Sequence, residues 1–596
     1  MPVSGNGFAA RPGWQQAMAA ASRKALRSRR DAESWEIWGD YLDDRKSPPE
    51  IAALLPGKCW PPAWSIPNCE GQPACKELLA TIKQLLRTRR PPRADIAALL
   101  RSWLDDPAQQ NPDAVRALEA VAWCHALPRL SKIVSSTTWW DLFEELLRLG
   151  TQAARTRVQD EPLVHQLLAG ELPLTLAYLL PEMPSCRKLA GKALDALSRG
   201  LTGLLHGDGI LHARQWDLFG PLLGCWTRSV VLCKQMQGGC WAETVQQQYD
   251  RFVRNLVRLR RADGSPVLSH GPGVKSLDEP LAAALRQSDD EDNRRIAAFL
   301  AKGARRTTKK PSRGRRLPEA AFHLESAATA VLRSDWSKSR EWLAVAYPDQ
   351  SVNIELNAGS SLLWSGRWEF QVQCDGRPAE PTGNWEEVCW LSDERGCYLE
   401  LEMRLGEGLR LQRQFLLAAQ DRFLYMADVI LGRRPGRLSY RGCLPLAEGV
   451  TWQGQNESRE GFLQGPKSRV LGLPLALPEW RATRGLGELH ASAQGLELCQ
   501  SDEGSCLLAP LFFDFDPRRV AHGLTWRQLT VAENRVVTRR DVAAGYRVMI
   551  GNRQWLIYRA LARKGNRTLL GHNLSSEMMI GRFTKDGIVE PVVEVD

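Results

Sequence analysis

The spacing of apolar residues changes across a Lys/Arg-rich stretch that runs from Lys302 to Arg316 of this 596-residue chain. Before the stretch, apolar residues recur at the three- and four-residue spacing of amphipathic helices. After it, apolar and polar residues alternate over short runs separated by Gly, Asp and Asn, which is typical of half-buried strands. A chain of this length is too long for one ordinary core, so we expect two large domains, the first helical and the second built from strands.

Five segments of the first half have the apolar pattern of helices. They cover about 138–150, 161–180, 190–205, 214–236 and 245–256. Thr138 is the expected N-cap of the first segment, and Pro173 is expected to kink or break the second. Short connections make consecutive helices antiparallel, so every second helix points the same way.

The second half carries the signals of antiparallel sheets. Alternation over 352–356, 368–374 and 399–405 predicts strands, and Asp375-Gly376 and Gly551-Asn552 predict hairpin turns. Many strands without a long helical insert imply a β-sandwich of several stacked sheets. The predicted organisation is a disordered N-terminus (1–12), a helical domain (13–301), a basic linker (302–318) and a β-sandwich domain (319–596).

The formal net charge is +11, and eight of the positive charges lie in the linker. Such a run is usually a solvated tether, which we favour, and the alternative is a surface that holds an anionic polymer. The basic run is not accompanied by the sequence pattern of a nucleic-acid-binding module, so the case for nucleic acid is weak. An acidic glycan is an equally good counter-ion. No segment has the length and apolarity of a signal peptide or a membrane span, which favours a cytoplasmic protein without a membrane partner. The oligomeric state is left open.

Tryptophan is unusually frequent, with 22 Trp against 14 Phe and 9 Tyr. In the second half, aromatic and charged residues occur together at 385–390, 457–460, 478–480 and 525–528. We interpret these segments as charge pairs on the solvent face of a sheet, with Trp packed inward. The alternative is a binding surface on which exposed Trp rings stack against sugar rings.

Helix direction gathers polar side chains at one end of the helical domain. The helix that ends at His206 and the helix that ends near Asp263 run the same way, so both Asp-Gly turns lie at that end. The segments that begin near Glu161 and Arg214 start there too. The predicted mouth collects His165, His206, Asp208, His212, Arg214 and Trp216.

His206 and His212 have two further interpretations. A His beside a helix end interacts well with the helix dipole, so both residues are candidates for simple caps. The His-x-Asp-x₃-His spacing at 206–212 also suits a metal, but no fourth ligand is in view. We therefore expect no metal and no other cofactor.

Three places in the sequence resemble one family. They are Val164-His165 before a long helix, the Asp208-Gly209 turn that leads to His212, Ala213 and Arg214, and the segment 331–336 at the start of the strands. Together with the domain order, these places resemble the heparinase II/III-like polysaccharide lyases and the related alginate lyases. That family pairs an N-terminal (α/α) toroid with a C-terminal multi-sheet β-sandwich, a supersandwich, and its opening strand is similar to 331–336.

The resemblance implies that the chain cleaves an acidic polysaccharide or oligosaccharide by β-elimination in the cleft between its two domains. This reaction needs a group that stabilises charge on the uronate carboxylate, a base for the C5 proton and an acid for the departing O4 oxygen. His165 and Arg214 are candidates for the carboxylate, and His206 and His212 for the proton transfers. Asp208, Trp216 and Tyr249 are candidate substrate-binding residues. Tyr249 is also a candidate acid, although its helical phase matches the apolar stripe and favours a core role.

The chain departs from the family pattern at three places. Val164 stands where the family has Asn, Leu218 and Phe219 stand where a Tyr is expected, and 348–356 lacks the expected His. Loss of one general base or charge stabiliser typically costs ~10²–10⁴ in rate. The alternative function is therefore a catalytically inactive relative that binds a carbohydrate or a protein through the same mouth.

Overall fold

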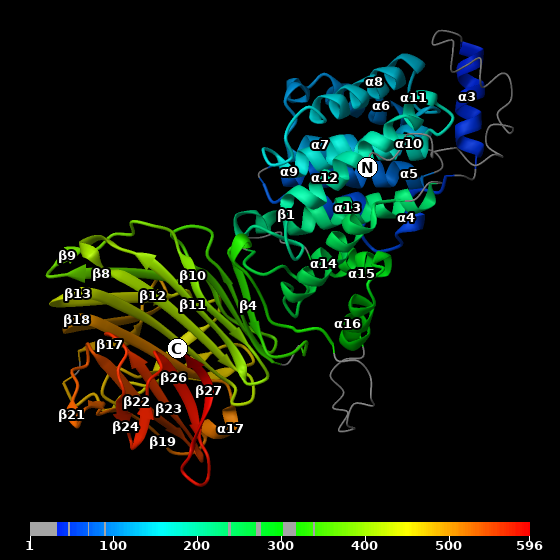
Figure 1. The fold of residues 1–596 in the computed structure, drawn as a ribbon. Helices are drawn as coiled ribbons and strands as arrows, with labels where there is room; N and C mark the ends of the chain where they lie inside the picture. The colour runs from blue at the N-terminus through cyan, green and yellow to red at the C-terminus, as the bar shows by residue number, and fades with distance from the viewer. Residues whose placement is uncertain are drawn as a thin grey trace. The chain divides into compact units, whose positions relative to one another are not determined.

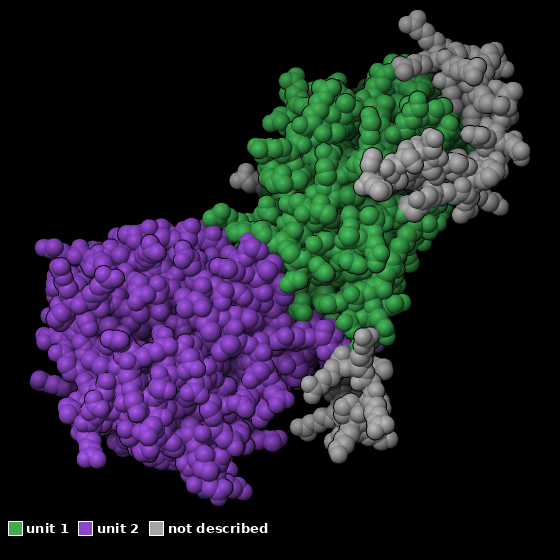
Figure 2. All heavy atoms as spheres, in the orientation of Figure 1, with its two compact units in different colours: residues 1–260, 264–297 green, residues 261–263, 298–596 purple. Residues whose placement is uncertain are grey.

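The chain forms two compact units in a computed structural model. The model describes residues 32–45, 48–69, 71–88, 91–236, 240–269, 276–301, 317–337, 340–484 and 486–596. Unit 1 contains the chain up to Arg260 together with Gly264–Ala297, and unit 2 contains Arg261–Asp263 and Ala298–Asp596 (Figure 2). The predicted disordered N-terminus (1–12) and residues 302–316 of the basic linker lie outside the described residues. A helical region followed by several antiparallel sheets confirms the predicted fold class (Figure 1).

Unit 1 is built from helices (Figure 1). Those before the first candidate residue are α3 (Ala32–Asp44), α4 (Ile51–Leu54), η1 (Pro61–Ser65), α5 (Gln72–Arg87), α6 (Arg93–Leu104), η2 (Pro107–Gln110), α7 (Ala114–Leu130) and α8 (Ser136–Ala153). They are followed by α9 (Pro162–His165), η3 (Gln166–Glu171), α10 (Leu172–Leu179), α11 (Pro184–Arg187), α12 (Leu189–Leu204), η4 (Ala213–Leu218), α13 (Phe219–Gln235), α14 (Glu243–Arg258), α15 (Asp278–Gln287) and α16 (Glu291–Ala301). Across the part of the chain that is described, every helix falls short of the length or apolarity that a bilayer crossing requires.

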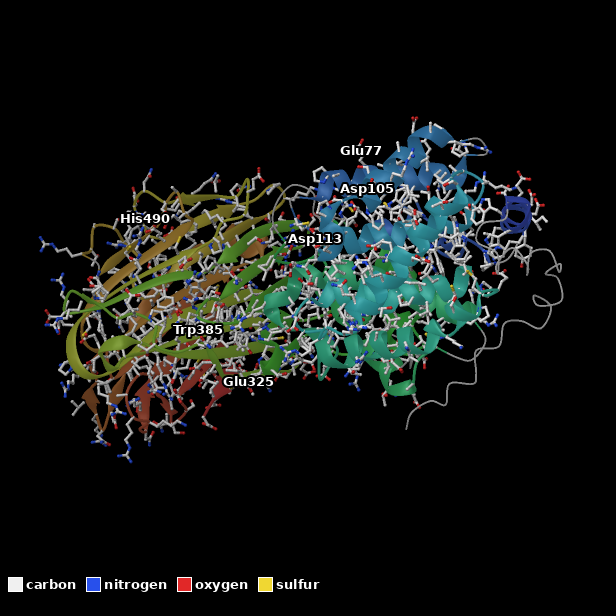
Figure 3. The ribbon with its side chains drawn as sticks, turned by 90° about the horizontal axis from the view of Figure 1, so that it is seen from above. Glu77, Asp105, Asp113, Glu325, Trp385 and His490 are labelled. Atoms are coloured by element: carbon white, nitrogen blue, oxygen red, sulfur yellow. The ribbon has the colours of Figure 1, made fainter. Side chains whose placement is uncertain are left out.

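The predicted helices form, although the first one begins at a different cap. The segments at 138–150 and 245–256 lie within α8 and α14, and 190–205 covers α12 to its end and the first residue of the strand that follows. In α8 the N-cap is Ser135, whose hydroxyl accepts a hydrogen bond from the backbone N–H of Thr138 at 3.2 Å. Asp113, labelled in Figure 3, caps α7 in the same way by accepting from the N–H of Arg116 at 2.8 Å.

The segment that holds Pro173 stays helical instead of breaking. α9, the π-helix η3 and α10 follow one another without a gap from Pro162 to Leu179. Pro173 lies in the first turn of α10, immediately after the π-helix. Pro173 has no N–H to donate to a carbonyl of the preceding turn and its ring crowds that turn, so the wider π-helical turn lies where the proline disturbs the α-helical pattern. The predicted break is therefore a change of helix type.

A fully buried ion pair joins three segments of unit 1. Arg228 of α13 donates from Nε and Nη2 to the two carboxylate oxygens of Glu171 at 2.5 and 2.7 Å, and both side chains are 0% exposed. The same guanidinium donates to the carbonyl oxygen of Pro61 at 2.8 Å and to the hydroxyl of Ser65 at 2.9 Å. The pair thus ties η1 and η3 to α13, and loss of either partner leaves a buried charge without its counter-ion.

Unit 2 consists of antiparallel sheets (Figure 1). The first sheet has the order β3 (Phe322–Leu324), β4 (Thr329–Arg333), β5 (Glu341–Ala346), β6 (Asn353–Ala358) and β7 (Ser361–Arg367). The eleven strands of the largest sheet are β8 (Glu369–Cys374), β9 (Arg377–Pro378), β10 (Glu386–Ser392), β11 (Gly396–Arg404), β12 (Arg410–Ala418), β13 (Phe423–Leu444), β14 (Thr451–Gly454), β15 (Gly461–Gln464), β16 (Arg469–Pro474), β17 (Gly487–Ala491) and β18 (Leu496–Asp514).

Two smaller sheets complete the unit. One has the order β19 (Leu524–Leu529), β22 (Ala543–Ile550), β23 (Arg553–Ala560), β26 (Met578–Phe583) and β27 (Val589–Val595). The other has the order β21 (Val536–Val537), β20 (Ala532–Glu533), β24 (Arg567–Leu569) and β25 (His572–Leu574). Three short helices, η5 (Glu325–Ala327), η6 (Gly406–Gly408) and α17 (Pro517–Val520), lie between strands.

The sheets stack because central strands are buried on both faces. In β23, Trp555 and Ile557 belong to the apolar core shared with the largest sheet, whereas Leu556 and Tyr558 belong to the core shared with the four-stranded sheet. This alternation follows the two-residue period of a strand. The layered arrangement agrees with the multi-sheet sandwich that the sequence predicts.

Local signals in the second half are mostly confirmed. The three predicted segments form β6, β8 and β11, and Asp375-Gly376 turns between β8 and β9 with φ values of 51° and 79°. Gly551 turns between β22 and β23 with φ of 59°. The segment 331–336 does not open the sheet, because β4 pairs with the earlier strand β3.

We predict that Arg228→Ala lowers the free energy of unfolding of the helical unit by about 3–5 kcal/mol, because the Glu171 carboxylate is left buried without a partner. Urea unfolding followed by the helical circular dichroism signal measures the change. The matched control is Arg157→Ala, which removes an ion pair with Asp160 whose side chains are 82% and 54% exposed. We expect this control to change stability by less than about 1 kcal/mol, and equal losses in the two variants would contradict the prediction.

Candidate functional site

A short hairpin after α12 carries most of the candidate residues. β1 (Leu205–His206) pairs with β2 (Ile210–Leu211), and Gly207-Asp208-Gly209 forms the turn between them (β1 is labelled in Figure 1). Gly209 has φ of 75°, a left-handed conformation that glycine adopts without strain. A Cβ at this position would lie 2.7 Å from the backbone nitrogen of Phe252, so the glycine also lets the turn press against α14.

Side chains of α14 hold this turn by its carbonyl groups. Asn255, which is 1% exposed, donates from Nδ2 to the carbonyl oxygens of Asp208 at 2.8 Å and Gly209 at 3.1 Å. Arg251 donates to the carbonyl oxygen of Gly207 at 3.1 Å. The turn after α12 is thus fixed against the last two turns of α14, which places the hairpin in one position.

The hairpin brings two imidazole rings together. The ring centroids of His206 and His212 are 5.8 Å apart at an interplanar angle of 46°, and both side chains are partly exposed. His212 also caps η4, because its Nδ1 accepts a hydrogen bond from the backbone N–H of Arg214 at 3.2 Å. A backbone N–H only donates, so Nδ1 of His212 is unprotonated and the ring proton lies on Nε2. His212 therefore presents an N–H donor beside the ring of His206.

Two charged candidates flank the imidazole pair. Asp208 lies in the turn and Arg214 in the first turn of η4, and both side chains are exposed. The hairpin and the start of η4 together, called here the 205–214 hairpin, thus carry two imidazoles, the negative charge of Asp208 and the positive charge of Arg214 at the surface of unit 1. Within the described ranges, no three or more His, Cys, Asp and Glu side chains gather as ligands for a metal ion.

His165 lies in a separate, buried hydrogen-bond network. Gln166 accepts from the indole Nε1–H of Trp226 at 2.8 Å and donates from Nε2 to the carbonyl of Ala196 and to Nδ1 of His165, both at 3.1 Å. Because an indole N–H only donates, Trp226 fixes the orientation of the amide, and His165 must carry its proton on Nε2. Burial, reinforced by the charge of Arg199, lowers the pKa of His165 below its usual value. His165 is therefore an uncharged donor.

His165 and the imidazole pair lie at different heights along α12. Gln166 bonds the carbonyl of Ala196, whereas the hairpin follows Leu204, the last residue of the helix. The same amide also lies against Gly200, four residues before Leu204, which is roughly 6 Å at the rise of an α-helix. The structure brings His206 and His212 together and places His165 in a separate, buried network.

Trp216 and Tyr249 lie in the core of unit 1. Tyr249 is 0% exposed, its hydroxyl lies 3.0 Å from that of Thr227, and burial raises its pKa above the usual value. Trp216 is 9% exposed and packs against Phe219 with ring centroids 5.8 Å apart. The buried place of Tyr249 agrees with its helical phase in the sequence.

The residues that position the site are absent from the sequence-based candidates. Gln166, Glu171 and Asn255 were not singled out, yet each holds a backbone or side-chain group in place. A signal exists for Gln166 and Glu171, because each is a polar residue inside an apolar stretch of a helix, whereas Asn255 lies among arginines and gives no such signal. A polar residue that is buried in this way needs hydrogen-bond partners, which identifies it as a positioning residue.

The fold of the whole chain is similar to solved structures of glycan lyases. One heparinase III structure has a TM-score of 0.63 at 10% identity and covers 92% of this chain and 98% of that one. A second heparinase III structure has a TM-score of 0.58 at 8% identity, with coverage of 91% and 97%. A mutant of the heparan sulfate lyase HepC from Pedobacter heparinus has a TM-score of 0.55 at 13% identity, with coverage of 91% and 98%. At these identities the likeness establishes the fold alone.

No protein-family model matches the chain, and no curated protein sequence is similar to it. The comparisons therefore establish the fold of the chain: a helical region followed by a multi-sheet β region, as in the solved heparinase-type lyases.

A matched pair of glycines in α12 tests the Gln166 network. A Cβ on Gly200 would lie 2.1 Å from Oε1 of Gln166, whereas a Cβ on Gly191 would have no atom within 4 Å. We predict that Gly191→Ala stabilises the protein by up to about 1 kcal/mol through helix propensity. Gly200→Ala should destabilise it by about 1–3 kcal/mol, because Gln166 is held by three hydrogen bonds and cannot move away freely.

Urea unfolding measures both glycine variants, and the ring resonances of His165 report whether Gln166 has moved. Stabilisation by both substitutions, with unchanged resonances of His165, would contradict the network.

Proposed function

We propose that the chain is a polysaccharide lyase that cleaves an acidic, uronate-containing glycan by β-elimination, with the 205–214 hairpin as its site. The observation that carries the proposal is the partly exposed pair of imidazoles, His206 and His212, beside the exposed guanidinium of Arg214. The similarity in fold to heparinase III and to heparan sulfate lyase supports the reaction class and an acidic glycan as its substrate.

The residues of the hairpin divide the chemistry among them. The positive charge of Arg214 and the Nε2–H of His212 stabilise the charge that develops on the uronate carboxylate. This role fits His212, because its Nδ1 is occupied by the backbone N–H of Arg214. His206 takes the C5 proton as general base while the C4–C5 double bond forms and the C4–O4 bond breaks. The same ring then returns the proton to O4, which balances the reaction, and Asp208 accepts hydrogen bonds from sugar hydroxyls.

Turnover is tested by following the ultraviolet absorbance of unsaturated uronate ends with alginate and heparan-type polymers. We predict that His206→Ala lowers kcat by about 10²–10⁴-fold, because the general base is lost. His212→Asn should lower kcat as well, although the Asn oxygen still caps η4, because the Nε2–H donor is removed. The control is His522→Ala, an exposed histidine of unit 2, which should leave kcat unchanged. Absence of the absorbance signal across the panel would refute the lyase, and full activity of His206→Ala would refute His206 as its general base.

A second function is favoured by the burial of Tyr249. Its hydroxyl is 0% exposed and lies against Thr227, so it is not at the surface where a glycan oxygen would need a proton. Val164 also stands where the resembled family has Asn. The second candidate is therefore a catalytically inactive protein that binds an acidic glycan at the same hairpin.

Calorimetric titration with a uronate tetrasaccharide separates the two functions. The binding protein predicts heat of binding without any rise in ultraviolet absorbance. Arg214→Gln should weaken this binding by about tenfold, because one charge-assisted hydrogen bond is lost. Turnover by the wild-type protein, or binding that is insensitive to Arg214→Gln, would exclude the second candidate.

A further inference from the structure

Trp480 of unit 2 is placed differently from the tryptophans around it. It is 49% exposed, more than any other tryptophan that the structure describes. Trp385 and Trp526 occur in similar aromatic and charged segments but are 4% and 1% exposed, as the sequence predicts for inward-packed rings. The prediction of an inward ring is wrong for Trp480. Nearly half of the Trp480 side chain is therefore accessible to a ligand.

The loop that carries Trp480, between β16 and β17, is held in place by a buried arginine. Arg459, which is 8% exposed, donates from Nη1 to the carbonyl oxygens of Pro478, at 3.0 Å, and Trp480. From Nη2 it donates to the carbonyl of Thr483 at 3.0 Å. Ser458 also forms a backbone bridge with Trp480. The exposed ring therefore projects from a backbone that is fixed before any ligand binds.

Trp480 borders a groove of about 340 Å³. This volume lies within the range of roughly 300–1,000 Å³ that is usual for small-ligand sites. Four charged side chains line the groove together with Trp480: Arg484, Arg527, Arg540 and Glu479. The three arginines are exposed, and Glu479 accepts a hydrogen bond from Thr525 at 2.6 Å. Three positive charges against one negative charge leave the lining at +2.

We propose that this groove is a second glycan-binding site, for an oligosaccharide that carries carboxylate or sulfate groups. The indole face of Trp480 packs on the apolar C–H face of a sugar ring, as aromatic rings do in carbohydrate recognition. The guanidinium groups of Arg484, Arg527 and Arg540 donate paired hydrogen bonds to the anionic groups of neighbouring sugars.

The groove shares its ligand class with the proposed function but none of its residues. All groove residues belong to unit 2, whereas the 205–214 hairpin belongs to unit 1. Binding at the groove therefore does not require turnover at the hairpin, and the two sites can be tested separately in the full chain.

Calorimetric titration of the full-length protein tests the groove with three hexasaccharides: a sulfated heparan-type chain, a carboxylate-only alginate chain and neutral cellohexaose. We expect both acidic chains to bind and cellohexaose to bind at least tenfold more weakly. Trp480→Ala and Arg527→Gln should each weaken the binding of the acidic chains by about tenfold. The first variant loses ring packing, and the second loses a charged hydrogen bond. Arg527 is 69% exposed, so its substitution does not threaten folding. The matched control is Arg377→Gln, an exposed arginine of β9, which should bind as the wild type does.

The hairpin variant His206→Ala separates this proposal from the proposed function, because it should lower kcat by about 10²–10⁴-fold and keep the part of binding that depends on Trp480. A larger response to the heparan-type chain than to alginate would assign the groove to sulfate, and equal responses would assign it to carboxylate. Wild-type affinity for the acidic chains in both Trp480→Ala and Arg527→Gln would overturn the proposal that the groove binds a glycan. Equal binding of cellohexaose would also overturn it, as would tighter binding of a single-stranded oligonucleotide at the same residues.

Discussion

The grip of α14 on the turn at 207–209 is the contact on which the candidate site depends. Two strands of two residues each have little stability of their own, because an isolated hairpin is marginal even when it is longer. Asn255 compensates by donating to two successive carbonyl groups from a buried position, and Gly209 permits the close approach. The partly exposed rings of His206 and His212 are positioned by these buried contacts and by the cap of η4.

Buried polar networks play the same role elsewhere in both units. In unit 1, Arg228 and Glu171 connect η1, η3 and α13, and Gln166 connects η3 to α12 and α13. In unit 2, Arg413 donates to both carboxylate oxygens of Asp428 and lies 3.8 Å from the ring centroid of Trp368. Such networks add little net stability, but an alternative packing would leave their charges unpaired. They therefore favour a single arrangement of elements whose sequences are otherwise uniformly apolar.

The fold was largely predictable because its signals are local. The stripe that becomes α14 and the alternation that becomes β11 each depend on neighbours within a few residues, and the phase of Tyr249 correctly indicated a core position. The π-helix before Pro173 was not predictable, because the segment 167–179 is apolar on almost every side and shows no stripe whose phase an extra residue would shift. Of the two outcomes expected at Pro173, a kink or a break, the break does not occur.

The sequence indicated which residues of the candidate site lie near one another better than it indicated how their side chains are oriented. Helix direction was enough to suggest that His206 and His212 lie at one end of the unit. The tautomer of His165 depends on Gln166, and the orientation of Gln166 depends on Trp226, which is 60 residues away. Exposure of Trp480 likewise depends on Arg459, 21 residues earlier in the chain. Side-chain orientation set by such distant partners cannot be read from spacing.

The central claim is that an acidic glycan binds at the 205–214 hairpin. The chain has nine histidines, so the ring ¹⁵N resonances of each can be assigned by single substitutions. Titration of the labelled protein with a uronate tetrasaccharide should shift the ring resonances of His206 and His212 in parallel, to saturation, and leave those of His522 in place. Saturating glycan without any shift at His206 and His212 would contradict the account.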